Sequence, residues 1–183
     1  MAGGAVSVVE TTRLRLRELS AGDAPFVLEL LNDPDFISNI GDRGVRTLHD
    51  ARRYIVSGPV ASYARYGFGL YLVDQKRPLQ AVGLCGLLHR DSHPDVEIGF
   101  ALLPQYRRQG YTLEAARAVM QLGLGQLGLT RIVAITAPDN RPSVRILEAL
   151  DLKFERMVHF ADDGSESRLY VLESRSADTL PSP

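Results

Sequence analysis

The sequence of 183 residues is poor in several residue types, and each scarcity excludes a class of protein. One cysteine, Cys85, allows neither an intrachain disulfide nor a zinc site built from cysteines, and it favours the cytoplasm. A formal net charge of -1 gives no overall positive field of the kind that attracts nucleic acid. The apolar runs are too short to span a membrane. We therefore expect a cytoplasmic protein that binds neither nucleic acid nor a membrane, and we expect no metal site.

Apolar residues, in contrast, make up 45% of the sequence. This share is large enough for a hydrophobic core and too large for a disordered chain. The length suits one domain of ordinary size, which we expect over residues 8–173. The polar residues 174–183 are expected to form a flexible tail.

Hydrophobic periodicity predicts about seven strands and about four helices. Three of the helices are expected to begin after Ser20, Thr47 and Asn140, which are residue types that cap helices, and the fourth after Gly110. Residues 33–45 are expected to form a loop. Short turns between three early strands predict an antiparallel meander, and a strand–helix–strand crossover follows, so the fold class is a mixed α/β sheet. The predicted strands cover residues 13–17, 69–73, 80–89, 96–102, 131–136, 153–160 and 167–172.

The most informative stretch runs from Val96 to Ala116 and has the pattern of a strand, a basic turn and the start of a helix. The start of a helix presents unpaired N–H groups and the positive end of the helix dipole, where a phosphate can bind. Gly110 leaves the backbone bare, and Arg107 and Arg108 supply positive charge beside it. The stretch therefore predicts a site for a ligand that carries a pyrophosphate.

The same turn resembles the acyl-CoA loop of the GCN5-related N-acetyltransferase (GNAT) superfamily. The signature of that loop is Gln or Arg, two residues, Gly, one residue, then Gly or Ala; Arg107, Gly110 and Thr112 stand at these places, with Thr112 replacing the small residue. The flanking sequence, from Glu97-Ile98-Gly99-Phe100 to Gly110-Tyr111-Thr112-Leu113-Glu114-Ala115, resembles the ribosomal-protein-alanine N-acetyltransferase branch.

The resemblance implies a GNAT-like fold, in which the sheet splays between the fourth and fifth of the seven strands, with acetyl-CoA as co-substrate. The arm of the cofactor is expected in the gap, where unpaired backbone groups could bind it as an added strand. The residues implied to bind the cofactor are Phe100, Ala101 and Leu102 for the arm, Arg107, Arg108, Gln109, Gly110, Tyr111 and Thr112 for the pyrophosphate, and Asn140 and Ser143 near the thiol end.

Acetyl transfer also needs a proton donor for the departing thiolate. Many members of the superfamily carry a Tyr seven residues after the Asn, but Leu147 stands there in this sequence. The ribosomal-protein branch carries a Ser three residues after the Asn, which Ser143 matches, so either Ser143 or a water is the acid. Capping alone would also explain Asn140.

Glu97 is the candidate general base. Strand alternation puts Glu97 on one face with Gly99 and Ala101, where a carboxylate could draw the proton of the amine through a water. The alternative is an ordinary solvated carboxylate. His89 and His93 are weaker candidates, because no partner for a relay is visible.

The sequence thus predicts an acetyl-CoA-dependent N-acetyltransferase in which a primary amine attacks the thioester directly. The amine is a protein N-terminus or a small molecule, and a homodimer is left open. Residues 36–43 and 63–68 are expected to wall the acceptor pocket, with Asp162 and Asp163 attracting a cationic amine. The alternative is a non-catalytic acyl-CoA-binding or interaction module, which the substitutions at Leu147 and Thr112 favour.

Overall fold

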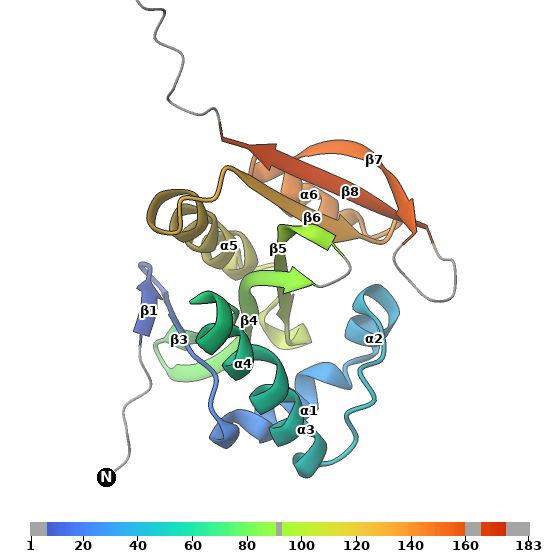
Figure 1. The fold of residues 1–183 in the computed structure, drawn as a ribbon. Helices are drawn as coiled ribbons and strands as arrows, with labels where there is room; N and C mark the ends of the chain where they lie inside the picture. Colours follow the sequence, from blue (N-terminus) through green and yellow to red (C-terminus); the bar gives the residue numbers. More distant parts are fainter. Residues whose placement is uncertain (1–6, 91–92, 160–165, 175–183) are drawn as a thin grey trace, which may run out of the picture.

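The computed structural model describes residues 7–90, 93–159 and 166–174 (Figure 1). Within these residues, eight strands form one mixed sheet in the order β1-β2-β3-β4-β5-β6-β8-β7. The strands are β1 (Ser7–Glu10), β2 (Leu14–Arg17), β3 (Leu70–Lys76), β4 (Leu79–Arg90), β5 (His93–Leu102), β6 (Arg131–Thr136), β7 (Lys153–His159) and β8 (Glu166–Glu173). The predicted fold class is confirmed; every predicted strand is present, and β1 adds an eighth beside β2.

Six α-helices cover the sheet within the described residues, against the expected four or so. They are α1 (Ala24–Leu31), α2 (Pro34–Ile40), α3 (Leu48–Ile55), α4 (Ala61–Tyr66), α5 (Tyr111–Gln121) and α6 (Arg141–Ala149). A wider helical turn, Val56–Val60, joins α3 to α4, and a second one, Leu122–Gln126, extends α5. None of the described helices is long and apolar enough to cross a membrane.

Helix α2 contradicts the prediction of a loop over residues 33–45. Asp33 caps the helix, because its side chain accepts a hydrogen bond from the Phe36 N–H at 3.1 Å. Pro34 occupies the first helical position, where its missing N–H costs nothing, and Phe36 is buried. The signal was therefore present in the sequence as an Asp-Pro pair, but the helix is too short to show a clear period.

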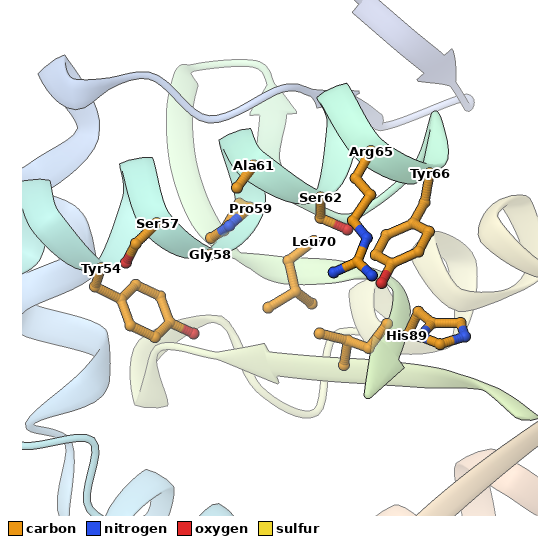
Figure 2. Close-up of a pocket in the computed structure, with 11 residues that line it drawn as sticks. Tyr54, Ser57, Gly58, Pro59, Ala61, Ser62, Arg65, Tyr66, Leu70 and His89 are labelled. Carbon is orange, nitrogen blue, oxygen red and sulfur yellow. The ribbon is translucent and has the colours of Figure 1, made fainter. Parts of the chain in front are cut away.

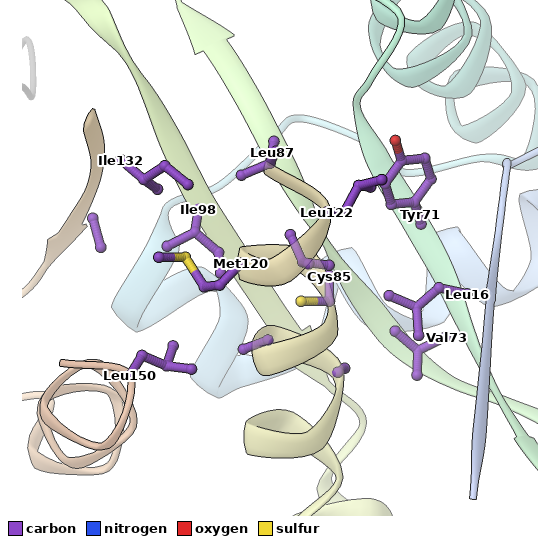
Figure 3. Close-up of a cluster of buried hydrophobic side chains, with 14 of the residues drawn as sticks. Leu16, Tyr71, Val73, Cys85, Leu87, Ile98, Met120, Leu122, Ile132 and Leu150 are labelled. Atoms are coloured by element: carbon purple, nitrogen blue, oxygen red, sulfur yellow. The ribbon is translucent and has the colours of Figure 1, made fainter. Parts of the chain in front are cut away.

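The core has two layers, one on each face of the sheet. On one face, α5 and α6 pack against inward side chains of β2 to β6, as Figure 3 shows for Cys85, Ile98 and Met120. On the other face, α1 and α3 pack against the sheet through residues such as Leu30, Ile55 and Leu72. Each fully buried leucine or isoleucine contributes about 1.5–3 kcal/mol relative to exposure, so both layers hold the sheet firmly.

The sheet opens between β5 and β6, as predicted. These parallel strands pair only at Val96 with Ile132 and at Glu97 with Val133. Beyond these pairs β5 continues to Leu102 on the edge of β4, while β6 continues to Thr136 on the edge of β8. One backbone edge of β5 is therefore free of strand pairing over residues 98–102, and the two halves of the sheet diverge there (Figure 1).

Candidate active site at the opening of the sheet

Helix α5 begins at the end of this gap with its backbone uncapped. Gly110 is the N-cap residue, with a φ of 79°, and no side-chain hydrogen bond caps the helix. Within the described part of the chain, the N–H groups of Arg108, Gln109 and Gly110 have no hydrogen-bond acceptor. A Cβ at Gly110 would meet only the Arg13 Nη2 atom, 3.3 Å away. The start of α5 thus offers free donors and open backbone.

Arg13 holds this turn in place, although sequence patterns gave it no such role. Its Nη1 donates to the Gln109 carbonyl oxygen at 2.9 Å, and its Nε donates to Glu114 Oε2 at 2.7 Å. The guanidinium carbon lies 4.6 Å from the centre of the Tyr111 ring, a cation–π distance. Since Glu114 belongs to the first turn of α5, Arg13 ties both sides of Gly110 to the start of β2.

The Glu114 carboxylate is the anchor of this contact. Burial acts to raise its pKa, but hydrogen bonds from Thr11 and Arg13 outweigh burial, and the pKa lies below its ordinary value. The Thr11 hydroxyl donates to it at 2.5 Å and the Arg13 N–H at 3.0 Å. A cavity of about 330 Å³ lies against the same helix start, lined by Thr11, Arg13, Gly110, Leu113, Glu114, Arg117, Ala118 and Gln121.

The Arg107 side chain is directed away from the helix start. It forms ion pairs with Asp33, at 2.5 Å, and with Asp35, and its Nε donates to the Leu102 carbonyl oxygen at 2.9 Å. Its own N–H donates to the Pro104 carbonyl oxygen at 3.2 Å. Arg107 therefore joins the turn to α2, and Arg13 is paired with Glu114, so the unpaired positive charge beside the free N–H groups is that of the exposed Arg108.

The remaining residues expected to bind the cofactor lie along the gap and at the starts of two helices. Phe100 and Ala101 are half-buried on the unpaired part of β5, and Leu102 is buried. Gln109 is exposed, and Tyr111 and Thr112 are half-buried in the first turn of α5. Three of these positions therefore lie on the free edge of β5 and three at the start of α5.

Asn140 and Ser143 open α6, which follows β6. The Asn140 side chain caps the helix by accepting a hydrogen bond from the Ser143 N–H at 3.2 Å. The half-buried Ser143 hydroxyl has no hydrogen-bond partner among the described residues, so it is available to a ligand. Leu147 is buried in the core shared with α5.

Glu97 lies where the gap begins. It is the last residue of β5 that pairs with β6, and it is only 7% exposed. Arg90 Nε donates to its Oε2 atom at 2.6 Å. The predicted strand faces are confirmed, because Val96 and Ile98 belong to the α5 core while Glu97 lies directly across from Leu88 on the opposite face.

A second cavity, of about 270 Å³, opens on that opposite face (Figure 2). Leu70 and Leu88 form part of its wall, and Leu88 is the cross-strand neighbour of Glu97. Gly99 makes room for this wall, because a Cβ there would lie 2.7 Å from Leu88 Cδ1. The lining residues are Tyr54, Ser57, Gly58, Pro59, Ala61, Ser62, Arg65, Tyr66, Leu70, Leu88 and His89.

Of the two segments expected to wall the acceptor pocket, only one lines this cavity. Segment 63–68 contributes Arg65 and Tyr66 to this cavity, whereas no residue of 36–43 lines it. His89 is exposed and stacks on Tyr66, with ring centres 4.7 Å apart. The side chain of His93, together with Asp162 and Asp163, lies outside the described residues. No three His, Cys, Asp or Glu side chains of the described residues gather as they would around a metal ion.

Comparisons with known proteins agree with this geometry. A family model described as an acetyltransferase (GNAT) domain matches residues 13–153. The chain belongs to the GNAT acetyltransferase family. The matched segment of this GNAT acetyltransferase includes the gap, the uncapped helix start and Ser143.

Relatives and solved structures extend the match over most of the chain. The uncharacterized N-acetyltransferase YjdG of Bacillus subtilis (strain 168) is 30% identical over 152 residues, which cover 78% of this chain and 88% of the relative. An acetyltransferase from Agrobacterium tumefaciens str. C58 shares the fold with a TM-score of 0.78 and 22% identity, over 95% of this chain and 98% of that chain. RimL, a ribosomal L7/L12 alpha-N-protein acetyltransferase solved with coenzyme A, gives a TM-score of 0.80 at 17% identity, over 92% of this chain and 98% of that chain.

Proposed function

We propose that this acetyltransferase transfers the acetyl group of acetyl-CoA to a primary amine, either a protein N-terminus or a small molecule. The observation that carries the proposal is the gap between β5 and β6, which leads to the uncapped start of α5. The free N–H groups around Gly110 suit a diphosphate. The free edge of β5 suits the amide groups of an extended arm, which can pair with it as a strand would.

The chemistry requires two proton movements at the mouth of the gap. When bound, acetyl-CoA supplies a thioester: the amine nitrogen bonds to the acetyl carbon, the carbon–sulfur bond breaks, and its electron pair stays on sulfur. Glu97, held by Arg90, is proposed to take the proton of the amine through a water. Backbone N–H groups of β5 beyond Glu97 are proposed to donate to the acetyl oxygen. Ser143 or a water is proposed to return a proton to sulfur.

The release of free thiol from acetyl-CoA tests the proposal. A panel of peptides and small amines is incubated with the protein and acetyl-CoA, and thiol appearance is followed with a colour reagent. We expect release with at least one class of amine and none without an amine. Binding of acetyl-CoA without release across the panel would support the alternative, a non-catalytic acyl-CoA-binding or interaction module, for which Leu147 in place of the usual Tyr is the argument.

Replacement of Glu97 tests the proposed base. Glu97→Gln is expected to lower kcat by about 100-fold at neutral pH, and the loss should shrink as the pH rises because more of the amine is then already neutral. Glu148→Gln, on an exposed position of α6, is the matched control and should leave the profile unchanged. A pH profile of the Glu97→Gln variant identical to that of the wild type removes Glu97 as the base.

A further inference from the structure

The cavity beside Glu97 has a chemical character that bears on the acceptor, provided that the proposed function holds. It lies between α3, α4 and the turn that joins them on one side and strands β3 and β4 on the other (Figure 2). Glu97 does not line the cavity itself, but its cross-strand neighbour Leu88 does, so a molecule in the cavity is separated from the proposed base by this one side chain. The cavity is on the face of the sheet opposite α5, so the acceptor and the cofactor would approach from different sides.

The charges around the cavity are of one sign. Among the described residues that line it, none is an aspartate or a glutamate, while Arg65 carries a positive charge. Arg65 forms no ion pair with any described carboxylate, whereas Arg53 of neighbouring α3 is paired with Asp50 at 3.1 Å. The nearest carboxylate of the proposed site, Glu97, is already paired with Arg90.

Aromatic rings fix the position of this free arginine. The Arg65 guanidinium carbon lies 5.0 Å from the centre of the Tyr66 ring, and Tyr66 stacks in turn on His89. Figure 2 shows Arg65 and Tyr66 extending from α4 toward the strands, with Tyr54 at the other end of the cavity and Leu70 between Tyr54 and Arg65. An arginine that contacts a ring in this way keeps N–H groups available for a planar anion.

The two serines of the cavity leave this role to Arg65. The Ser57 hydroxyl donates to the Arg53 carbonyl oxygen at 2.8 Å, and the Ser62 hydroxyl donates to the Phe68 carbonyl oxygen at 2.7 Å. Both serines are therefore already bonded to the backbone. A volume of about 270 Å³ is near the lower end of known ligand sites, which suits a small molecule and not a folded protein segment.

We propose that the acceptor is a small amine that carries an anionic group, a carboxylate or a phosphate, and that Arg65 binds this group while Tyr66 and Leu88 contact the apolar body of the molecule. The amine then lies toward Glu97, and the anion lies toward α4. Arg65 is thus a residue that determines specificity for the acceptor, and the transfer step itself remains the one given above.

Matched pairs of amines test this proposal. The carboxylate arm compares phenylalanine with phenylalaninamide, and the phosphate arm compares phosphoethanolamine with ethanolamine. For the wild type we expect kcat/KM to be at least about tenfold higher for the anionic member of one pair, because a charge-assisted hydrogen bond adds about 1.5 kcal/mol or more. The pair that shows the preference identifies the anion.

Variants of Arg65 assign the preference to this side chain. Arg65→Gln should remove the preference, and Arg65→Glu should reverse it, while Arg53→Gln, on the exposed face of α3, should keep it. Because Arg65 is exposed and makes no ion pair among the described residues, the variants are expected to keep the melting temperature of the wild type. Calorimetry of the anionic amines with the protein alone gives a second readout, in which Arg65→Gln should weaken binding by a similar factor.

Three outcomes would overturn the proposal. The first is equal kcat/KM within both pairs; the second is a preference that survives in Arg65→Gln; the third is a neutral peptide amide that outperforms every anionic small amine. Each of these leaves the acetyltransferase function intact, because thiol is still released. Failure of every amine to release thiol, with acetyl-CoA bound, would instead contradict the proposed function and remove the acceptor proposal with it.

Discussion

Helices α3 and α5 begin in opposite ways. At α3, Thr47 Oγ1 accepts from the Asp50 N–H at 3.1 Å, and the Asp50 carboxylate accepts from the Thr47 N–H at 3.1 Å, so the helix start is closed by its own side chains. At α5, Gly110 provides no side chain, and the neighbouring N–H groups stay free. Support comes instead from Arg13, a residue distant in sequence. We propose from this difference that the start of α3 serves stability and the start of α5 serves a ligand.

Among the changes that test this comparison of the two helix starts, blocking the open start of α5 should have the largest effect. Gly110→Val should weaken acetyl-CoA binding by about tenfold or more, because the new side chain fills the approach to the free N–H groups. Gly128→Val is the matched control: Gly128 also has a positive φ, 64°, so the backbone penalty is similar, but it lies beyond the other end of the helix. Calorimetry should show weaker binding for Gly110→Val only. Wild-type affinity in that variant would refute the assignment.

Loss of Arg13, which supports the start of α5 from outside the helix, should have a smaller effect on cofactor binding. Arg13→Ala is expected to raise KM for acetyl-CoA about three- to tenfold with kcat nearly unchanged, because Arg13 positions the turn and does not touch the reacting atoms. Arg53→Ala removes an exposed ion pair at the start of α3 and should change neither constant. Steady-state kinetics with varied acetyl-CoA separates the two constants, and a fall in kcat alone would contradict a positioning role.

Removal of the side-chain cap of α3 should lower the stability of the fold without changing the affinity for acetyl-CoA. Thr47→Ala removes the cap of α3 and is expected to lower the free energy of unfolding by about 1 kcal/mol. The affinity for acetyl-CoA should stay at the wild-type value, since α3 lies on the other face of the sheet. Urea unfolding and calorimetry on the same sample check both expectations. A Thr47→Ala variant that binds acetyl-CoA more weakly would show that the two helix starts are not separate in function.

The smallest expected effect is on thermal stability, when the Glu114 carboxylate is replaced or is protonated at low pH. Its pKa is lowered in the folded chain, so its stabilising contribution is complete above its ordinary pKa of about 4.3 and is lost as the pH falls through the lowered value. Glu114→Gln should therefore melt below the wild type at about pH 7, and the difference should be smaller at about pH 3. Melting curves at the two pH values measure this. If the wild type and Glu114→Gln differ in melting temperature by the same amount at both pH values, the charge of Glu114 is not the cause of the difference.

Local signals explain how much of the site could be predicted from the sequence. The period of β5, the basic turn and Gly110 lie within about twenty residues, and each part has its own pattern. The same holds for Asn140, whose cap bond reaches only three residues ahead. Helix α2 also carried a local signal, Asp33 followed by Pro34, which a prediction based on long periods passed over.

Long-range contacts explain the remainder. Arg13 and Glu114 are 101 residues apart in sequence, and only the packing of α5 beside β2 brings them together. Arg107 was expected to place its charge at a phosphate, but its partners Asp33 and Asp35 come from a helix more than seventy residues earlier. The cavity around Arg65 likewise combines α4 with the end of β4. No periodicity or motif reports such pairings, because they follow from the tertiary packing.

The binding of the diphosphate at the start of α5, with the arm in the gap, is the central claim. Backbone amide signals followed by NMR during a titration with coenzyme A test it most directly. We predict that the largest shifts occur at residues 108–112 and 98–102, and that the amides at the start of α3, residues 47–50, do not move. Shifts at the start of α3 or elsewhere, with those of 108–112 unchanged, would contradict the account.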